Sequence, residues 1–128
     1  MHIMIVDNDE AWTRSLEILL KQRGYEVTAF TEAECACEFI DRVARAGFLS
    51  ESDLPDAVVL DYVMPRLTGY QVLARIASEL KKRCVVVFVT GHGDQLRNAD
   101  FKQMGVAACL EKPVDVDELV KVLEEKAA

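Results

Sequence analysis

The sequence predicts an α/β fold, in which a parallel β-sheet carries helices on both of its faces. Apolar segments of strand length alternate with segments of helical periodicity along the 128 residues. Several of the apolar segments contain no polar residue, which is typical of strands buried on both faces of a parallel sheet. Polar residues follow these segments directly, at the position where open α/β sheets place their ligand crevices.

Length and charge limit the classes of protein to consider. A chain of 128 residues suits one core, so we expect a single domain over residues 1–128. The formal charge of −7 argues against nucleic acid or an acidic membrane as a direct partner, because both bind basic surfaces. The apolar runs are far shorter than the roughly 20 residues that span a bilayer.

The four cysteines lie in apolar or helical segments rather than in loops: Cys35, Cys37, Cys84 and Cys109. This distribution is typical of reduced thiols and favours a cytoplasmic protein. Cys35 and Cys37 have no second Cys or His pair near them in the sequence, so we expect no metal site there.

The N-terminal part of the chain predicts two pairs of a strand and a helix. Residues 3–6 form an apolar strand, and the acids that follow suit the start of a helix. The apolar stripe of this helix consists of Trp12, Leu16, Leu19 and Leu20. We therefore expect Trp12 in the core. Residues 25–30 alternate polar and apolar side chains, which predicts a strand at an edge of the sheet. A second amphipathic helix then ends near Gly47.

The C-terminal part continues the alternation. Residues 57–61 and 84–89 are the most apolar strands, and a helix begins at Gly69 between them. A helix over residues 95–104 has a thin apolar stripe, so we expect it to be the least firmly packed. Residues 106–110 form the last strand, and a final amphipathic helix follows.

Five strands alternating with five helices fit the doubly wound (βα)5 arrangement of flavodoxin-like folds, a three-layer sandwich with strand order 2-1-3-4-5. This order places the alternating second strand at an edge and the apolar first, third and fourth strands inside. The crevice then opens between strands one and three. The polar residues that the strand ends bring to it are Asp7, Asn8, Asp61, Thr90 and Lys112.

The residues at this crevice suit phosphate chemistry. Clustered acids attract a hard cation, and Mg²⁺ takes one or two carboxylates while it keeps waters and phosphate oxygens. A carboxylate such as Asp61 can attack a phosphoryl group, whose charge then needs a metal, an ammonium and a hydroxyl. Lys112 and Thr90 would supply the ammonium and the hydroxyl. By its position alone, Asp61 could equally be a residue that caps its loop.

Four motifs resemble those of the receiver domain of bacterial two-component response regulators, over essentially the whole chain. That family has an acidic pair after strand one, a D-x-x-M-P-x-x-x-G motif after strand three, a Thr or Ser that ends strand four and a Lys-Pro pair that ends strand five. The matching residues here are Asp7-Asn8, Asp61 with Met64-Pro65 and Gly69, Thr90, and Lys112-Pro113.

The resemblance implies a phosphoacceptor function. Asp61 would accept a phosphoryl group from a sensor histidine kinase or a phosphotransfer protein, with Thr90 and Lys112 as the other catalytic residues. The ligands of Mg²⁺ would be Asp7, Asn8, Asp61 and the backbone carbonyl of Val63. Apart from this self-directed phosphotransfer and the loss of the phosphoryl group, the domain would not be an enzyme.

The resemblance also implies structural details and an output. The Lys112–Pro113 peptide bond would be cis, which is energetically cheap only before proline. Phosphorylation would act through Thr90 and residue 109 on the face built from the fourth helix, the fifth strand and the fifth helix. The resemblance also implies that phosphorylation could lead the domain to form a homodimer.

The sequence departs from the family at two positions. The second member of the acidic pair is Asn8, whose amide oxygen can coordinate a metal but carries no charge. Asp9 could compensate for it or could cap the helix. The position three residues before Lys112, usually aromatic, holds Cys109, so a rotating ring cannot report activation here.

Two other classes of function are consistent with parts of the sequence. An aspartate-nucleophile phosphatase of the haloacid-dehalogenase kind would need an acid two residues after Asp61, where this chain has Val63. A receiver-like binding module that never carries phosphate would explain Asn8 and Cys109, but the joint presence of Asp61, Thr90 and Lys112 argues against it. The kinase, a following effector domain and the oligomeric state cannot be read from the sequence.

Overall fold

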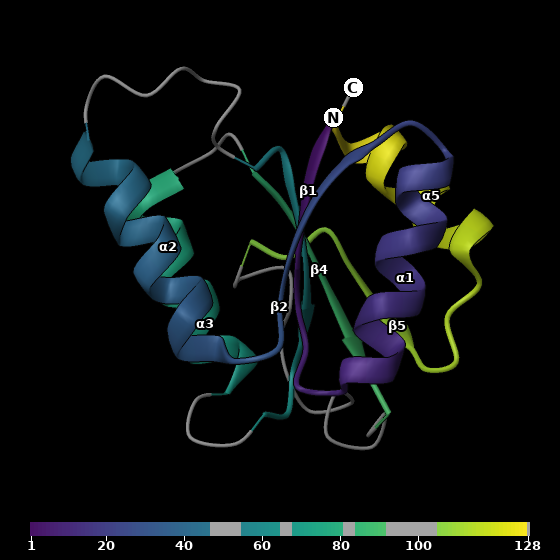
Figure 1. The fold of residues 1–128 in the computed structure, drawn as a ribbon, viewed down its shortest axis with the longest axis horizontal. Coiled ribbons are helices and arrows are strands. Elements are labelled where there is room, and N and C mark those ends of the chain that lie inside the picture. Colours follow the sequence, from purple (N-terminus) through teal and green to yellow (C-terminus); the bar gives the residue numbers. More distant parts are fainter. Residues whose placement is uncertain (47–54, 65–67, 81–83, 92–104, 128) are drawn as a thin grey trace.

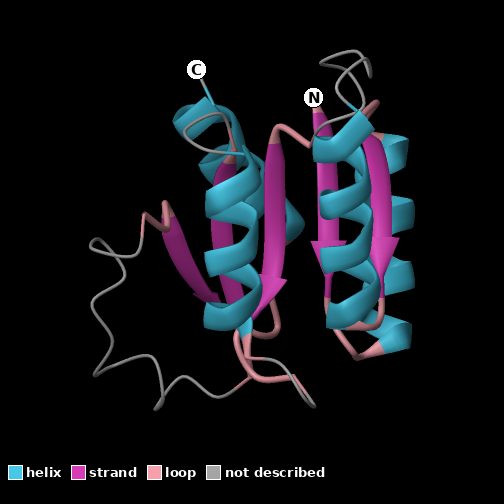
Figure 2. Ribbon diagram, turned by 90° about the vertical axis from the view of Figure 1, so that its left-hand side faces the viewer, coloured by secondary structure: helices cyan, strands magenta, loops and turns pink. Residues whose placement is uncertain are grey.

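A five-stranded parallel sheet forms the centre of the computed structural model, which describes residues 1–46, 55–64, 68–80, 84–91 and 105–127. Its strands are β1 (His2–Val6), β2 (Glu26–Phe30), β3 (Ala57–Asp61), β4 (Val85–Thr90) and β5 (Ala108–Glu111). Their order is β2-β1-β3-β4-β5, with parallel pairing throughout, which confirms the predicted topology. Figure 2 shows that all five strands point the same way, so their carboxyl ends share one edge of the sheet.

Four helices cover the two faces of this sheet in the described residues: α1 (Glu10–Gln22), α2 (Ala33–Ala46), α3 (Gly69–Leu80) and α5 (Val116–Ala127). Helices α2 and α3 lie on one face and α1 and α5 on the other, which makes three layers (Figure 1). The expected helix over residues 95–104 lies outside the described residues.

The apolar strands feed two core layers, one on each face of the sheet. In β1, Met4 and Val6 belong to the layer under α2 and α3, whereas Ile3 and Ile5 belong to the layer under α1 and α5. All four side chains are completely buried. Burial of one such side chain contributes about 1.5–3 kcal/mol, so an uninterrupted apolar strand is stable only where both faces are covered.

The two edge strands show where the sequence-based boundaries hold and where they shift. Strand β2 lies at an edge, as predicted, and Val27 is its one buried residue. Strand β5 forms the other edge and begins at Ala108 rather than at Val106. Val106 is buried in the core after a turn at Gly105, where φ is +80°. The Ala107 N–H donates to the Val86 carbonyl at 2.8 Å, and the regular ladder with β4 begins at Ala108.

Helix α1 buries a narrower stripe than predicted. Its buried residues are Thr13, Leu16 and Leu20, whereas Leu19 is 42% exposed and Trp12 only half-buried. Trp12 and Leu19 are seven residues apart and share one flank of the helix, beside the buried line rather than on it. The buried stripe therefore does not include Leu19, and the expectation that Trp12 belongs to the core is only partly met.

The four cysteines are free thiols in the structure. Cys37 is buried, Cys35 is exposed, and Cys84 and Cys109 are half-buried. No helix in the described part of the chain has the length and apolar character needed to cross a lipid bilayer.

Candidate functional site

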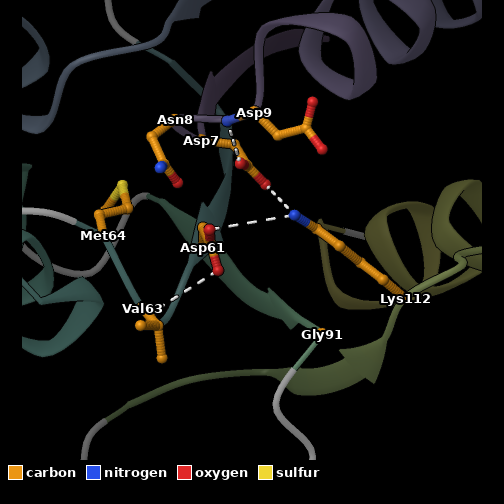
Figure 3. A pocket seen from close by; sticks show the side chains of 8 residues that line it. All are labelled: Asp7, Asn8, Asp9, Asp61, Val63, Met64, Gly91 and Lys112. Atoms are coloured by element: carbon orange, nitrogen blue, oxygen red, sulfur yellow. Dashed lines mark hydrogen bonds and ion pairs between the residues drawn. The ribbon is translucent and has the colours of Figure 1, made fainter.

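The carboxyl ends of the strands surround a cavity of about 520 Å³ (Figure 3). Asp7 and Lys112 follow β1 and β5, and Asp61 is the last residue of β3. The described residues that line the cavity are Asp7, Asn8, Asp9, Asp61, Val63, Met64, Gly91 and Lys112. The fold thus brings together five of the residues expected there: Asp7, Asn8, Asp61, Val63 and Lys112.

Asp7 is completely buried and held from several sides. Its Oδ1 accepts a hydrogen bond from the backbone N–H of Asp9 at 2.8 Å, and its backbone carbonyl accepts one from the Thr13 hydroxyl at 3.1 Å. Its buried Oδ2 accepts no hydrogen bond of good geometry from the described residues but forms an ion pair with Lys112 Nζ at 2.6 Å. A buried charge is costly without a partner, and Lys112 supplies that partner here.

Asp61 is buried with weaker compensation. Its Oδ1 accepts a hydrogen bond from the backbone N–H of Val63 at 3.3 Å, and its Oδ2 lies 3.9 Å from Lys112 Nζ. Burial raises the pKa of the Asp61 carboxyl to about 6, the negative charge of Asp7 adds to the rise, and the Lys112 ammonium opposes it. Asp61 therefore carries a negative charge at neutral pH that the protein only partly balances.

Lys112 connects the two carboxylates. Its side chain is 20% exposed, and its ammonium lies between Asp7 and Asp61, nearer to Asp7 (Figure 3). The same ammonium lies over the ring of Trp12, 4.5 Å from the ring centroid. The Lys112–Pro113 peptide bond is cis. One cation thus contacts two acids and one aromatic ring.

Thr90 lies at the end of β4 but not on the cavity surface. It is completely buried, and its backbone carbonyl accepts a hydrogen bond from the backbone N–H of Lys112 at 2.8 Å. Its neighbour Gly91 lines the cavity instead. Cys109 is half-buried and pairs with Phe88 across the β4–β5 ladder. Burial raises the pKa of the Cys109 thiol to about 11, so the thiol is neutral at physiological pH.

Asn8 and Asp9 lie at the exposed rim of the cavity. Asp9 is the N-cap of α1, where its Oδ1 accepts a hydrogen bond from the backbone N–H of Trp12 at 3.1 Å. The Asp9 carboxylate points away from Asp61, whereas the Asn8 side chain lies on the side of the cavity that carries Met64 and Asp61 (Figure 3). Of the two roles that the sequence allows for Asp9, the structure shows helix capping.

The donor set at the cavity fits a hard divalent cation. The described residues contain no group of three His, Cys, Asp or Glu side chains that could hold a metal. The cavity instead offers two carboxylates, from Asp7 and Asp61, next to the amide of Asn8 and the main chain at Val63. One or two carboxylates with neutral oxygens and room for water are what Mg²⁺ prefers. The negative charge at the buried Asp7 Oδ2 and at Asp61, which Lys112 balances only in part, would favour the binding of such an ion.

The surroundings of Gly69 explain why the motif that begins at Asp61 has a glycine at this position. A Cβ at this position would lie 2.5 Å from the backbone oxygen of Asp61 and 2.8 Å from Cα of Tyr62. The Gly69 N–H donates a hydrogen bond to the Tyr62 carbonyl at 2.8 Å. The start of α3 thus packs directly on the backbone that carries Asp61, and only glycine leaves room for this contact.

The site residues predicted from the sequence do not include Trp12, Gly91 or Met64, although Met64 belongs to the motif that begins at Asp61. Trp12 was assigned to the core because it fits the apolar period of α1. The available signal was its place in the first turn of a helix that begins at the acidic cluster. Gly91 directly follows β4, a position that the sequence does not distinguish from an ordinary loop.

The 2-1-3-4-5 sheet places two acids and a lysine at its strand ends, an arrangement that suits the binding of a metal ion and a phosphoryl group. Residues 3–124 match the response regulator receiver domain family. The chain belongs to this family, whose members are signalling domains that interact with histidine kinases or phosphotransfer proteins and typically bind Mg²⁺.

Individual relatives agree with this assignment. The chain is 32% identical to the transcriptional regulatory protein FixJ of Bradyrhizobium diazoefficiens over 123 residues, covering 96% of the chain and 55% of FixJ. It is 34% identical to the tetrathionate response regulatory protein TtrR of Salmonella typhimurium over 127 residues, covering 95% of the chain and 54% of TtrR. The chain therefore spans about half the length of these curated relatives.

Solved structures give the same fold. A receiver domain protein from Clostridium thermocellum superposes with a TM-score of 0.81 at 22% identity, covering 98% of this chain and 93% of that one. The structure of FixJ-N superposes with a TM-score of 0.78 at 25% identity, covering 98% and 92%. These relatives support a receiver domain. They favour neither the aspartate-nucleophile phosphatase nor the binding module that never carries phosphate, called the silent module below.

Proposed function

We propose that Asp61 accepts a phosphoryl group from a histidine kinase or a phosphotransfer protein in a Mg²⁺-dependent reaction. One observation carries the proposal: the buried Asp61 carboxylate faces the cavity beside Asp7, and Lys112 balances it only from 3.9 Å. A carboxylate attacks phosphorus in its ionised form, and an Asp61 oxygen without a cation in close contact stays accessible to a phosphoryl group.

The transfer follows from the groups at the cavity. With its pKa near 6, Asp61 is ionised at neutral pH, and one of its oxygens bonds to phosphorus while the bond from phosphorus to the donor imidazole nitrogen breaks. The imidazole leaves with the electron pair of that bond. The Lys112 ammonium is within reach of the incoming group and balances part of its charge.

Mg²⁺ would be held by Asp7, Asn8, Asp61 and the backbone carbonyl of Val63. When bound, the ion supplies positive charge that screens the phosphoryl oxygens from the two carboxylates. The Asp7 carboxylate is oriented for that role by the backbone N–H of Asp9, which donates to its Oδ1, and the Thr13 hydroxyl holds the Asp7 backbone by donating to its carbonyl.

The output is proposed to pass through Thr90 and the position of Cys109. A phosphoryl group on Asp61 would attract the Thr90 hydroxyl, a bond that exists only in the phosphorylated state and therefore biases the conformation. Cys109 is small, so Thr90 can move without the rotation of a ring. The surface that responds would comprise the expected helix over residues 95–104 together with β5 and α5.

We further propose a cytoplasmic domain without enzymatic turnover of external substrates, consistent with its free thiols. The formal charge of −7 suits a domain that does not itself bind nucleic acid. A homodimer that forms on phosphorylation would use the same output surface.

Labelling with acetyl phosphate and Mg²⁺ tests the phosphoacceptor role. Mass spectrometry should find one phosphoryl group on Asp61, and Asp61→Asn should abolish it, whereas the rim variant Asp9→Asn should retain it. A phosphoryl group on Asp7 or Asp9 would contradict the assignment. Turnover of added phosphoesters would indicate the phosphatase, and the absence of any labelling would indicate the silent module.

A further inference from the structure

Trp12, the only tryptophan of the chain, lies against the ammonium of Lys112. The Nζ atom is 4.5 Å from the ring centroid, within the about 6 Å over which the face of an aromatic ring attracts a cation. The two residues are far apart in the sequence and meet because α1 begins, and β5 ends, at the same edge of the sheet.

The first turn of α1 fixes the position of the ring. The backbone N–H of Trp12 donates a hydrogen bond to the capping carboxylate of Asp9, and the half-buried indole side chain packs against the core layer under α1 and α5. The next residue, Thr13, is buried and donates to the backbone carbonyl of Asp7. The start of the helix therefore contacts both residues that surround the ammonium, since it carries the indole ring and its N-cap residue Asp9 donates a backbone N–H to the Asp7 carboxylate.

The ring limits where a flexible side chain can go. Lysine has a long stem with several rotatable bonds, and holding its ammonium in one place costs conformational entropy. Lys112 Nζ is 2.6 Å from Asp7 Oδ2 and 3.9 Å from Asp61 Oδ2, so of the two carboxylates only that of Asp7 holds the ammonium closely. The ring covers a further side of the ammonium and favours this place over one in solvent.

We propose that Trp12 is a positioning residue for Lys112, whose ring face holds the ammonium beside Asp7 within reach of a phosphoryl group on Asp61. The kinetic consequence rests on the proposed function of Asp61, whereas the contact between ring and ammonium does not. Loss of the ring should slow labelling of Asp61 about two- to tenfold, the range expected for a partly exposed cation–π contact.

The test compares Trp12→Phe, which keeps an aromatic face, with Trp12→Leu, which keeps an apolar side chain without one. The Lys112 side-chain proton resonances, assigned by their absence in Lys112→Met, should be shifted upfield by the ring in the wild-type chain and in Trp12→Phe. In Trp12→Leu they should return to ordinary positions, and acetyl phosphate labelling should slow. Ile18→Ala, on the exposed part of the same helix, is the matched control and should change neither readout.

Several results would overturn the inference. Equal losses of labelling in Trp12→Phe and Trp12→Leu would mean that Trp12 acts by packing alone. Unshifted Lys112 resonances in the wild-type chain would mean that the contact is absent. If Trp12→Leu does not fold, the emission spectrum of Trp12 decides: it should change in Lys112→Met, and an unchanged spectrum would refute the contact. A wild-type chain that is never labelled would refute the proposed function, while the resonances would still decide the role of Trp12.

Discussion

Asp61→Asn is expected to stabilise the folded chain at neutral pH, although it removes the proposed phosphoacceptor. The pKa of Asp61 is raised from 3.8 to about 6, first by burial and then by the charge of Asp7. A carboxyl whose pKa is higher in the folded state than in the unfolded state opposes folding once it is ionised. The difference between 3.8 and 6 corresponds to at most about 3 kcal/mol in the free energy of unfolding.

The pH window follows from the same values. Below pH 3.8 the carboxyl is protonated in both states and costs nothing; the cost grows as pH rises toward about 6 and is complete above it. Asparagine has nearly the same shape and no charge, so the variant avoids this cost at every pH. Lys112 keeps its closer partner, since Asp7 lies at 2.6 Å and Asp61 at 3.9 Å.

Urea unfolding between pH 4 and pH 8, with EDTA present, measures the effect. The stability difference between Asp61→Asn and the wild-type chain should be close to zero at pH 4 and reach about 1–3 kcal/mol at pH 7.5. Glu125→Gln removes an exposed charge from α5 and should show no comparable pH dependence. A variant that is not more stable at pH 7.5, or that gains as much at pH 4, would refute the reasoning.

Other changes test other parts of the site. Asn8→Asp should tighten Mg²⁺ binding about tenfold in a titration, because it adds a full charge next to the ion; unchanged affinity would mean that Asp9 already acts as a ligand, and Asp9→Asn would then weaken binding. Gly69→Ala should lower the free energy of unfolding by about 1–3 kcal/mol through its clash with the backbone of Asp61, whereas Gly91→Ala, which meets no atom within 4 Å, should not. Beryllofluoride, a phosphoryl mimic, should alter hydrogen exchange mainly between Thr90 and Cys109, and changes confined to α2 would contradict the proposed output.

Much of the fold could be predicted because burial on both faces of a sheet leaves its mark on a short stretch of the sequence. Strands such as β1 and β3 are buried on both faces, so an apolar run marks them, and the position of Asp61 at the end of such a run places it at the edge where ligands bind. The predicted start of β5 is two residues too early because Val106 is as buried as a strand residue, and only the regular ladder with β4 shows that the strand begins at Ala108.

The details of the site depend on contacts between distant residues, which the sequence does not encode locally. Periodicity assigned Trp12 to the core because an apolar residue in a helix is usually buried there, and nothing near it in the sequence indicates Lys112. The role of Asp9 was undecided because the same carboxylate can cap a helix or bind a metal. The hydrogen bond from the backbone N–H of Trp12 to the Asp9 carboxylate shows that Asp9 caps the helix. This bond depends on the direction of the Asp9 side chain, which the sequence does not reveal.

The distribution of charge at the cavity links metal binding to phosphorylation. Lys112 largely neutralises Asp7, which leaves Asp61 as a partly balanced charge, and Lys112 is the one cationic residue among the described residues that line the cavity. A phosphoryl group on Asp61 adds further negative charge, which this single ammonium cannot match. Asn8 contributes an oxygen without charge, and Asp9 is engaged at the helix terminus. The phosphorylated state should therefore need a higher free Mg²⁺ concentration than in a receiver with two acids after β1, which a Mg²⁺ titration of acetyl phosphate labelling in the wild-type chain and in Asn8→Asp would measure.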